Sequence, residues 1–148
     1  AAAAAAAVHL LKGEEGVELR RTHQRQAMLT KHALSAAGLP VMANPSHIVP
    51  VFVGDAELCK AASDMLLERH AIYIQPINYP TVARGTERLR ITPTPFHTDA
   101  HVAELVEAMT DVWKTLKLPF EEPKIVALRP RQTQPDPCSF PDFKKAAE

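Results

Sequence analysis

The sequence predicts a small α/β domain, α+β-like in character, in which a short and mostly antiparallel sheet is backed by helices. Three observations carry this prediction. Apolar residues recur at helical spacing between 98 and 116, short apolar runs near 47–53 and 71–75 favour strands, and Pro/Gly-rich turns separate these segments. The order of helix, strand, helix, strand, strand, helix and tail fits a sheet packed against helices. The 148 residues are enough for one domain with its own core.

The first predicted element is a helix over about 8–37, broken near Gly13 and Gly16. Gly38, followed by Pro40, predicts where this helix ends. Glycine readily takes the left-handed conformation that closes a helix, and proline cannot continue one. The opening run of seven alanines favours helix, because alanine is the best helix former. That run supports no functional interpretation.

The next predicted elements are a strand at 47–53 and a helix that ends near His70. Pro50 lies within the strand, and proline has no N–H for a sheet ladder. This strand is therefore expected at an edge of the sheet or with a bulge. Asp55 is a suitable N-cap for the helix. The helix is predicted from apolar positions at helical spacing, namely Leu58, Ala61, Ala62, Met65 and Leu66.

A second strand is predicted at 71–75, followed by a Pro/Gly-rich loop over 76–85 and a third strand that carries two arginines. Side chains alternate between the faces of a strand, so Arg88 and Arg90 share one face and their apolar neighbours share the other. A guanidinium held on a strand can grip a planar carboxylate through two parallel hydrogen bonds. Arg88 is expected to be the more solvent-exposed arginine, and Glu87 is expected to pair with a nearby arginine.

The last predicted helix opens at Thr98-Asp99 and presents one apolar stripe to the core. The stripe consists of Val102, Leu105, Val106, Met109, Val112, Trp113 and Leu116. After Lys117 prolines become frequent. We therefore predict one domain over 1–118 and a Pro-rich C-terminal extension over 119–148, which is an extended arm or a disordered tail.

The charge balance and the distribution of apolar residues, cysteines and histidines argue against several classes of partner for this chain. Acidic and basic residues balance at 17 each, so no long-range field favours nucleic acid or anionic lipid. No apolar run is long enough to span a membrane, and no secretory signal is visible. The two cysteines lack zinc-like spacing and fit free thiols in a reducing compartment, and the scattered histidines predict no metal site. We interpret His47 and His97 as capping or packing residues.

Long stretches of the chain resemble the C-terminal part of the 5-aminolevulinate synthase family, one of the α-oxoamine synthases. The resemblance covers about 8–118 and is far more specific than one short motif, because the stretches follow in the same order. The sister synthases share the Arg-x-Arg strand, whereas the Ile-Asn-Tyr-Pro-Thr-Val and Thr-Pro-Thr-Pro segments look closer to the 5-aminolevulinate synthases. The stretches are Gly38-Leu39-Pro40, Pro45 to Val51 with Gly54-Asp55, Ser63 to Leu67, Ile74 to Val82 with Arg84-Gly85, and Glu87 to Pro95 with His97.

This resemblance implies the small C-terminal domain of a fold-type-I pyridoxal-phosphate enzyme, which has the aspartate-aminotransferase fold and works as a homodimer. It implies condensation of glycine with succinyl-CoA to give 5-aminolevulinate, CoA and CO2 in heme biosynthesis. Pyridoxal 5'-phosphate would serve as the electron sink for a glycine carbanion. The extension beyond Leu118 favours an enzyme of the mitochondrial matrix over one of the bacterial cytoplasm.

Four residues of the chain match substrate-binding positions of the family. Arg90 matches the arginine that holds the glycine carboxylate, and Thr81 matches a threonine near the succinyl carboxylate. Asn78 to Gly85 match a loop that closes over bound substrates, and Arg84 lies on this loop. The residues alone leave plainer alternatives open. Arg90 and Arg84 also fit solvated surface charges, and Thr81 also fits a loop hydroxyl bonded to its own backbone.

The resemblance places the catalytic and cofactor-binding residues outside this chain. In the family a Schiff-base lysine, an aspartate and a stacking histidine lie upstream, and none of Lys12, Lys31 or Lys60 stands in the family's lysine context. We therefore expect part of a longer enzyme, inactive alone, that depends on a missing N-terminal portion and a homodimer partner. Two alternatives stay open. One is another α-oxoamine synthase, namely glycine acetyltransferase, 8-amino-7-oxononanoate synthase or serine palmitoyltransferase; the other is a non-catalytic stand-alone domain.

Overall fold

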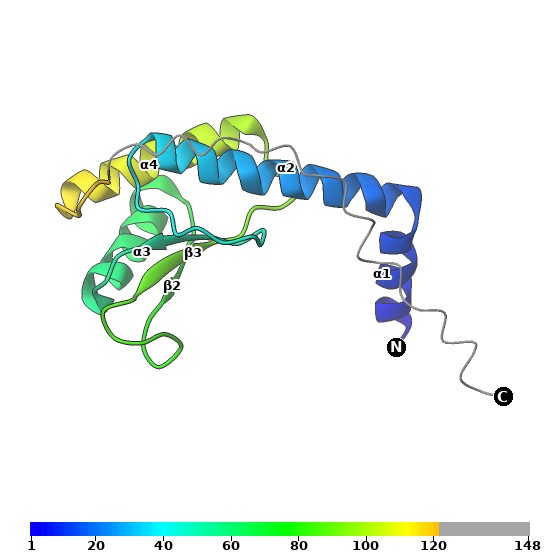
Figure 1. Ribbon diagram of the computed structural model, residues 1–148, viewed down its shortest axis with the longest axis horizontal. Helices are drawn as coiled ribbons and strands as arrows, with labels where there is room; N and C mark the ends of the chain where they lie inside the picture. The colour runs from blue at the N-terminus through cyan, green and yellow to red at the C-terminus, as the bar shows by residue number, and fades with distance from the viewer. Residues whose placement is uncertain (122–148) are drawn as a thin grey trace.

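The computed structural model describes residues 1–121, which fold into helices and a three-stranded antiparallel sheet of order β1-β3-β2. The predicted fold class is confirmed. In Figure 1, α2 and α4 run side by side, and α1 bends away from the N-terminal end of α2. The elements follow in the order α1 (Ala2–Lys12), α2 (Glu14–Ala36), β1 (Val49–Phe52), α3 (Ala56–His70), β2 (Gln75–Ile77), β3 (Arg88–Ile91) and α4 (Asp99–Thr115).

The predicted break in the first helix falls at Gly13, whose backbone is extended between α1 and α2. Gly16 continues α2 instead of breaking it. It is buried against the last turn of α1, and a Cβ atom there would lie 2.4 Å from the carbonyl oxygen of Leu10. The second glycine therefore permits a close approach of two helices, whereas the first changes the direction of the chain.

Gly38 ends α2 as predicted, in a Schellman arrangement. Its φ is +78°, and the amide of Leu39 donates to the carbonyl of Leu34 at 3.0 Å. The chain after α4 returns to this corner, where the amide of Glu121 donates to the carbonyl of Gly38 at 2.8 Å. A Cβ atom at Gly38 would lie 2.9 Å from the carbonyl oxygen of Glu121. Most of the predicted Pro-rich extension lies outside the described residues.

Gly38→Ala is expected to destabilise the protein more than Gly85→Ala. Both glycines have nearly the same positive φ, +78° and +80°, so both substitutions carry the left-handed backbone penalty of about 1–2 kcal/mol. A Cβ atom at Gly85 meets nothing within 4 Å, whereas one at Gly38 meets backbone. Thermal unfolding followed by circular dichroism measures the difference. Equal losses for both variants would show that the return of the chain to this corner does not matter.

β1 is shorter than predicted, but it lies at an edge of the sheet, as Pro50 requires. Asp55 caps α3 as predicted, accepting from the amide of Leu58 at 2.8 Å. One apolar residue that predicted this helix does not pack in the core. Leu58 is 37% exposed, because the first turn of α3 directs Cys59 inward instead. Cys59 is buried with a free thiol, and burial raises its pKa.

β2 overlaps the predicted segment 71–75 only at Gln75. Ala71 takes the left-handed conformation as the C-cap of α3, and the ladder begins at Gln75. The observed register pairs Gln75 with Arg90, and its continuation would place residue 72 opposite Pro93, which has no N–H. Residues 72–74 lie outside the ladder. Pro76 lies inside β2, which the edge position of this strand allows.

β3 directs Leu89 and Ile91 into the core, as predicted, but two expectations about its charged residues are wrong. Glu87 shares the inward face and is 2% exposed, and its Oε2 forms no hydrogen bond within residues 1–121. Arg88 is half-buried, and its Nε donates to the carbonyl of Thr86 at 2.9 Å, whereas Arg90 is exposed. The alternation of side chains turns Glu87 inward, away from the arginine with which it was expected to pair.

The apolar stripe of α4 is confirmed, with five of its residues buried and Val106 and Leu116 packed half-buried against the core. Trp113 is fully buried, and its indole N–H donates to the carbonyl of Pro119 at 3.2 Å. The main cluster of buried residues joins α2, α3, α4 and the inner face of the sheet. No helix within residues 1–121 has both the length and the apolar character needed to cross a bilayer.

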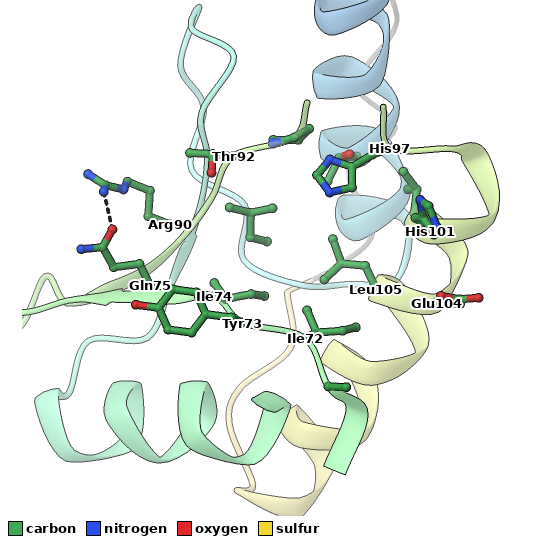
Figure 2. A pocket seen from close by; sticks show the side chains of 15 residues that line it. Ile72, Tyr73, Ile74, Gln75, Arg90, Thr92, His97, His101, Glu104 and Leu105 are labelled. Carbon is green, nitrogen blue, oxygen red and sulfur yellow. Dashed lines mark hydrogen bonds between the residues drawn. The ribbon is translucent and has the colours of Figure 1, made fainter. Parts of the chain in front are cut away.

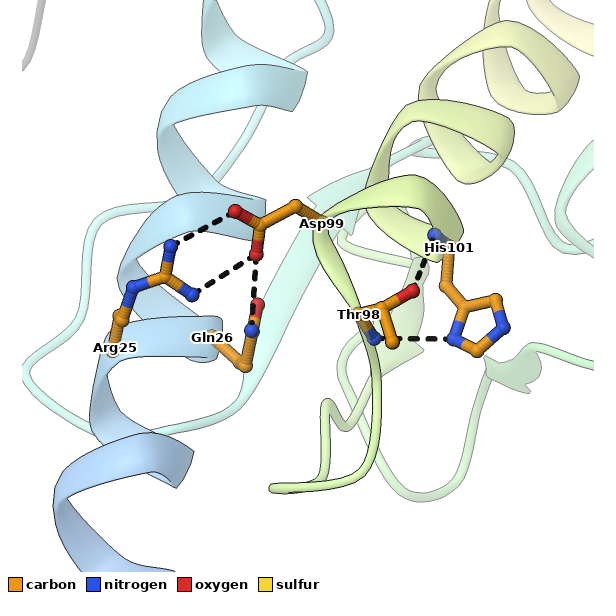
Figure 3. A network of polar contacts seen from close by, with 5 residues as sticks. All are labelled: Arg25, Gln26, Thr98, Asp99 and His101. Carbon is orange, nitrogen blue, oxygen red and sulfur yellow. Dashed lines mark hydrogen bonds and ion pairs between the residues drawn. The ribbon is translucent and has the colours of Figure 1, made fainter.

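The start of α4 is fixed by a polar network (Figure 3). Thr98 and His101 form a capping box, in which each side chain accepts from the other residue's amide. Arg25 on α2 grips Asp99 through two bonds of 2.9 Å, and Gln26 adds a third of 3.2 Å. These hydrogen bonds, that of Arg25 foremost, lower the pKa of Asp99 from 3.8 to about 2. The network thus ties α2 to the N-terminus of α4.

Asp99→Asn is expected to reduce stability at neutral pH, with an effect that fades in acid. A carboxylate whose pKa is lowered by folding stabilises the protein above its unfolded pKa of 3.8, and the contribution is lost as the pH falls towards about 2. Unfolding temperatures of wild type and variant should therefore converge between pH 5 and pH 2. Asp64→Asn is the control, because its exposed pair with Lys60 lies within one helix. A gap that stays constant with pH would contradict the prediction.

Candidate functional site

The candidate site is an open pocket of about 500 Å³ between the sheet and the N-terminal half of α4 (Figure 2). β3 and the segment after it form one wall, and residues 71–75 form a second. Ile74 and Leu105 provide apolar surface, whereas Arg90 and Gln75 lie together at one side. An apolar pocket with a few polar groups is the usual form of a small-molecule site.

Arg90 brings positive charge to the edge of this pocket. Its position on β3 directs the side chain away from the core, and its Nη2 donates to Oε1 of Gln75 on the neighbouring strand. Within residues 1–121 its guanidinium forms no ion pair. The charge is therefore available to an anion, and the planar fork suits a carboxylate. The residue singled out from sequence thus lines the pocket.

Histidines lie on the α4 side of the same pocket. His97 accepts from the amide of Thr94 at 2.8 Å through Nδ1, so it has the local structural role predicted for it, although it also lines the pocket. His101 uses its Nδ1 in the capping box. The other histidine interpreted as a packing residue, His47, lies against His23 with ring centroids 4.7 Å apart. The contacts of His97 and His101 hold the chain that leads from β3 into α4, whereas the contact of His47 with His23 joins the segment before β1 to α2.

The loop between β2 and β3 holds the three other predicted site residues, and it lies outside the pocket lining. Asn78 anchors the loop, because its Nδ2 donates to the carbonyl of Ala56 at 3.2 Å. Thr81 is exposed, and its amide donates to the carbonyl of Asn78 at 2.9 Å. Its hydroxyl forms no hydrogen bond to the described part of the chain. Arg84 is exposed and stacks 4.9 Å from the ring centroid of Tyr79.

Two residues of this region, Gln75 and Tyr79, were not predicted from the sequence to belong to the site. Gln75 contacts Arg90 because the strands pair in one particular register, and no local pattern in the sequence specifies that register. Tyr79 precedes Arg84 by five residues within the loop, and an aromatic residue near an arginine in a short loop is a weak signal for a cation–π contact. Both contacts hold a guanidinium in place.

The described residues provide no lysine at the pocket. Lys31 is the half-buried lysine of α2, and burial lowers its pKa. Its ammonium donates to the carbonyls of Asn44 and Ser46, so it holds the loop before β1. Lys60 pairs with Asp64 on the surface. No group of three or more His, Cys, Asp or Glu side chains within residues 1–121 could hold a metal ion.

Fold and site together define a small α/β domain that presents an unpaired guanidinium to an open pocket. Residues 1–109 match the family model Aminotransferase class I and II. The chain belongs to this family.

Curated relatives share much of the sequence. The chain is 58% identical over 108 residues to 5-aminolevulinate synthase of Bradyrhizobium diazoefficiens, covering 73% of this chain and 26% of that protein. It is 57% identical over 103 residues to the mitochondrial 5-aminolevulinate synthase of Kluyveromyces lactis, covering 70% of this chain and 18% of that protein. The chain thus spans about a quarter or less of these relatives, which include bacterial and mitochondrial proteins.

Solved structures share the fold. A serine palmitoyltransferase from S. paucimobilis with bound PLP has a TM-score of 0.61 at 21% identity, covering 69% of this chain and 26% of that one. An 8-amino-7-oxononanoate synthase from Francisella tularensis has a TM-score of 0.60 at 23% identity, covering 74% of this chain and 32% of that one. At these identities the likeness concerns the fold alone.

Proposed function

We propose that this chain forms the C-terminal part of a 5-aminolevulinate synthase, which condenses glycine with succinyl-CoA to 5-aminolevulinate, CoA and CO2 in heme biosynthesis. The observation that carries the proposal is the 58% identity over 108 residues to a protein of that name. The geometry supports it, because the arginine expected to hold the amino-acid carboxylate lies at a pocket with its charge unpaired. In this proposal the domain is 1–118, and 119–148 is an extension.

Each predicted site residue has a role in this proposal. Arg90 binds the glycine carboxylate with its fork of N–H groups. Thr81 donates its free hydroxyl to the carboxylate of the succinyl group. Asn78 anchors the loop that carries Thr81, and Arg84 helps this loop to close over the substrates. The anchor at Asn78 and the exposed centre of the loop support a closing movement, because the centre can move while the sheet keeps its position.

The proposed cofactor is pyridoxal 5'-phosphate, which when bound acts as an electron sink at the α-carbon of the amino acid. The described residues do not fit a complete site for it, because no lysine lines the pocket and the half-buried Lys31 is bonded to loop carbonyls. In the proposal this chain supplies substrate-binding residues alone. The Schiff-base lysine and the other cofactor-binding residues then come from an N-terminal portion and a homodimer partner. No metal and no nucleic acid takes part.

We propose the mitochondrial matrix as the location, with the bacterial cytoplasm as the alternative. The Pro-rich residues after Leu118 support the mitochondrial assignment, because the compact bacterial enzymes are expected to end earlier. The complete open reading frame tests it through the presence or absence of an N-terminal mitochondrial presequence. The same reading frame tests for the upstream lysine.

The activity is tested by assaying the full-length protein with glycine and a panel of acyl-CoA donors. We expect succinyl-CoA to give the highest kcat/KM. Preference for acetyl-CoA with glycine would instead indicate glycine acetyltransferase. Preference for pimeloyl-CoA with alanine would indicate 8-amino-7-oxononanoate synthase, and preference for palmitoyl-CoA with serine would indicate serine palmitoyltransferase. If the full-length protein had neither the upstream lysine nor a cofactor absorption band, the result would support the alternative that the chain is a non-catalytic stand-alone domain.

A further inference from the structure

Gln75 is the direct cross-strand neighbour of Arg90. The β2–β3 register places the two residues opposite each other, and Oε1 of Gln75 accepts a hydrogen bond from Nη2 of Arg90 (Figure 2). Both side chains are exposed and both line the pocket. Opposite residues in an antiparallel pair are the closest side-chain neighbours in a sheet, so this contact follows from the register.

We propose that Gln75 is a positioning residue that orients the Arg90 guanidinium for the carboxylate of the amino-acid substrate. This inference rests on the proposed function. A guanidinium has five N–H groups, and the bond to Gln75 uses one of them. Enough donors remain to form a fork with a carboxylate. Arg90 is thereby held at one end and free to bind at the other.

The neutrality of the glutamine amide is essential to this arrangement. An acidic residue at position 75 would also accept from Arg90, but it would neutralise the charge and compete with the substrate carboxylate. Glutamine gives orientation without neutralisation. Glu104 also lines the pocket, but it forms no ion pair with Arg90. The guanidinium of Arg90 therefore stays unpaired and available to an incoming anion.

Orientation matters because an exposed arginine has many rotamers. Ordering such a side chain when the substrate binds costs conformational entropy, which weakens binding. Gln75 provides the one side-chain hydrogen bond that Arg90 makes to the described part of the chain. Its loss should appear chiefly in the glycine KM, because the carboxylate contact is made in the ground state and in the transition state alike.

The test uses four variants of the full-length protein: Gln75→Met, Gln75→Glu, Arg90→Lys and the double variant Gln75→Met/Arg90→Lys. We expect Gln75→Met to raise the glycine KM about tenfold, with kcat and the acyl-CoA KM within about twofold. Gln75→Glu should raise the glycine KM further, because it adds competing charge. The control is Gln24→Met, which removes an exposed glutamine of α2 and should change neither constant.

A second measurement separates positioning from a general structural role. Calorimetric binding of glycine should weaken in Gln75→Met, whereas binding of glycinamide, which lacks the carboxylate, should not. In the Arg90→Lys background, Gln75→Met should have little further effect, since the residue acts through Arg90. Equal losses for glycine and glycinamide, or additive losses in the double variant, would overturn the proposal.

The outcomes also distinguish this inference from the proposed function. An increased glycine KM in Arg90→Lys together with an unchanged one in Gln75→Met would overturn the positioning role and leave the proposed function in place. An unchanged glycine KM in Arg90→Lys would remove Arg90 from the site, and the proposed site and the positioning role would both fall.

Discussion

Arg90→Lys in the full-length enzyme is expected to raise the glycine KM by about 10- to 100-fold, with a smaller effect on kcat. Lysine keeps the positive charge but replaces the planar fork with a single ammonium group. The second parallel hydrogen bond to the carboxylate is then lost. A hydrogen bond to a charged group contributes about 1.5–3 kcal/mol, which sets the expected size of the effect.

Arg88→Lys is the matched control for this prediction. Arg88 lies two residues away on the same strand and the same face, but its Nε is bonded to the carbonyl of Thr86 and it does not line the pocket. Steady-state kinetics with varied glycine should therefore separate the two variants. Equal effects at 88 and 90 would mean that the strand, and not the guanidinium of Arg90, sets the affinity for glycine.

Helices and their ends could be predicted from the sequence because local signals determine them. The stripe of α4 follows from 3.6-residue periodicity, the stop at Gly38 from the left-handed backbone, and the cap at Asp55 from its carboxylate. Each of these features depends on residues that are close together in the sequence. In the folded protein these features lie where the local signals predicted them.

The sheet could be predicted less well, because its register joins residues far apart in the chain. The strand predicted at 71–75 is displaced along the chain, because its ladder begins only at Gln75 and continues to Ile77. Glu87 was expected to pair with a nearby arginine, and it is buried without an ion pair in the described residues instead. Gln75 remained unnoticed as a neighbour of Arg90 for the same reason. Strand propensity is local, whereas strand pairing is not.

The candidate site, like the sheet, could be predicted only in part from the sequence. Sequence stretches in a family-like order singled out Arg90, and the structure places it at a pocket. Thr81 and Arg84 were singled out in the same way, yet in this structure they lie on a loop outside that pocket. A loop that acts by closing over substrates need not line the pocket before closure, so their roles stay predictions that kinetic tests must decide.

Trp113→Ala is expected to reduce the free energy of unfolding by about 3–5 kcal/mol, the range for removing a large aromatic side chain from a core. Trp113 is fully buried among residues of α2, α3, α4 and the sheet. Urea unfolding followed by circular dichroism measures the loss. Phe96→Ala is the control, because Phe96 is 80% exposed and its truncation should change stability by no more than about 0.5 kcal/mol.

Trp113→Phe separates the contribution of the indole hydrogen bond to stability from that of apolar packing. Phenylalanine keeps most of the buried apolar surface but cannot donate to the carbonyl of Pro119, which the indole N–H now reaches at 3.2 Å. We expect a loss of about 1–3 kcal/mol, the cost of leaving a part-buried acceptor without its donor together with a small cavity. If Trp113→Phe were neutral, the tryptophan would act through packing alone. The hydrogen-bond part of the loss would reflect the hold of α4 on the start of the segment after Leu118, which returns to Gly38.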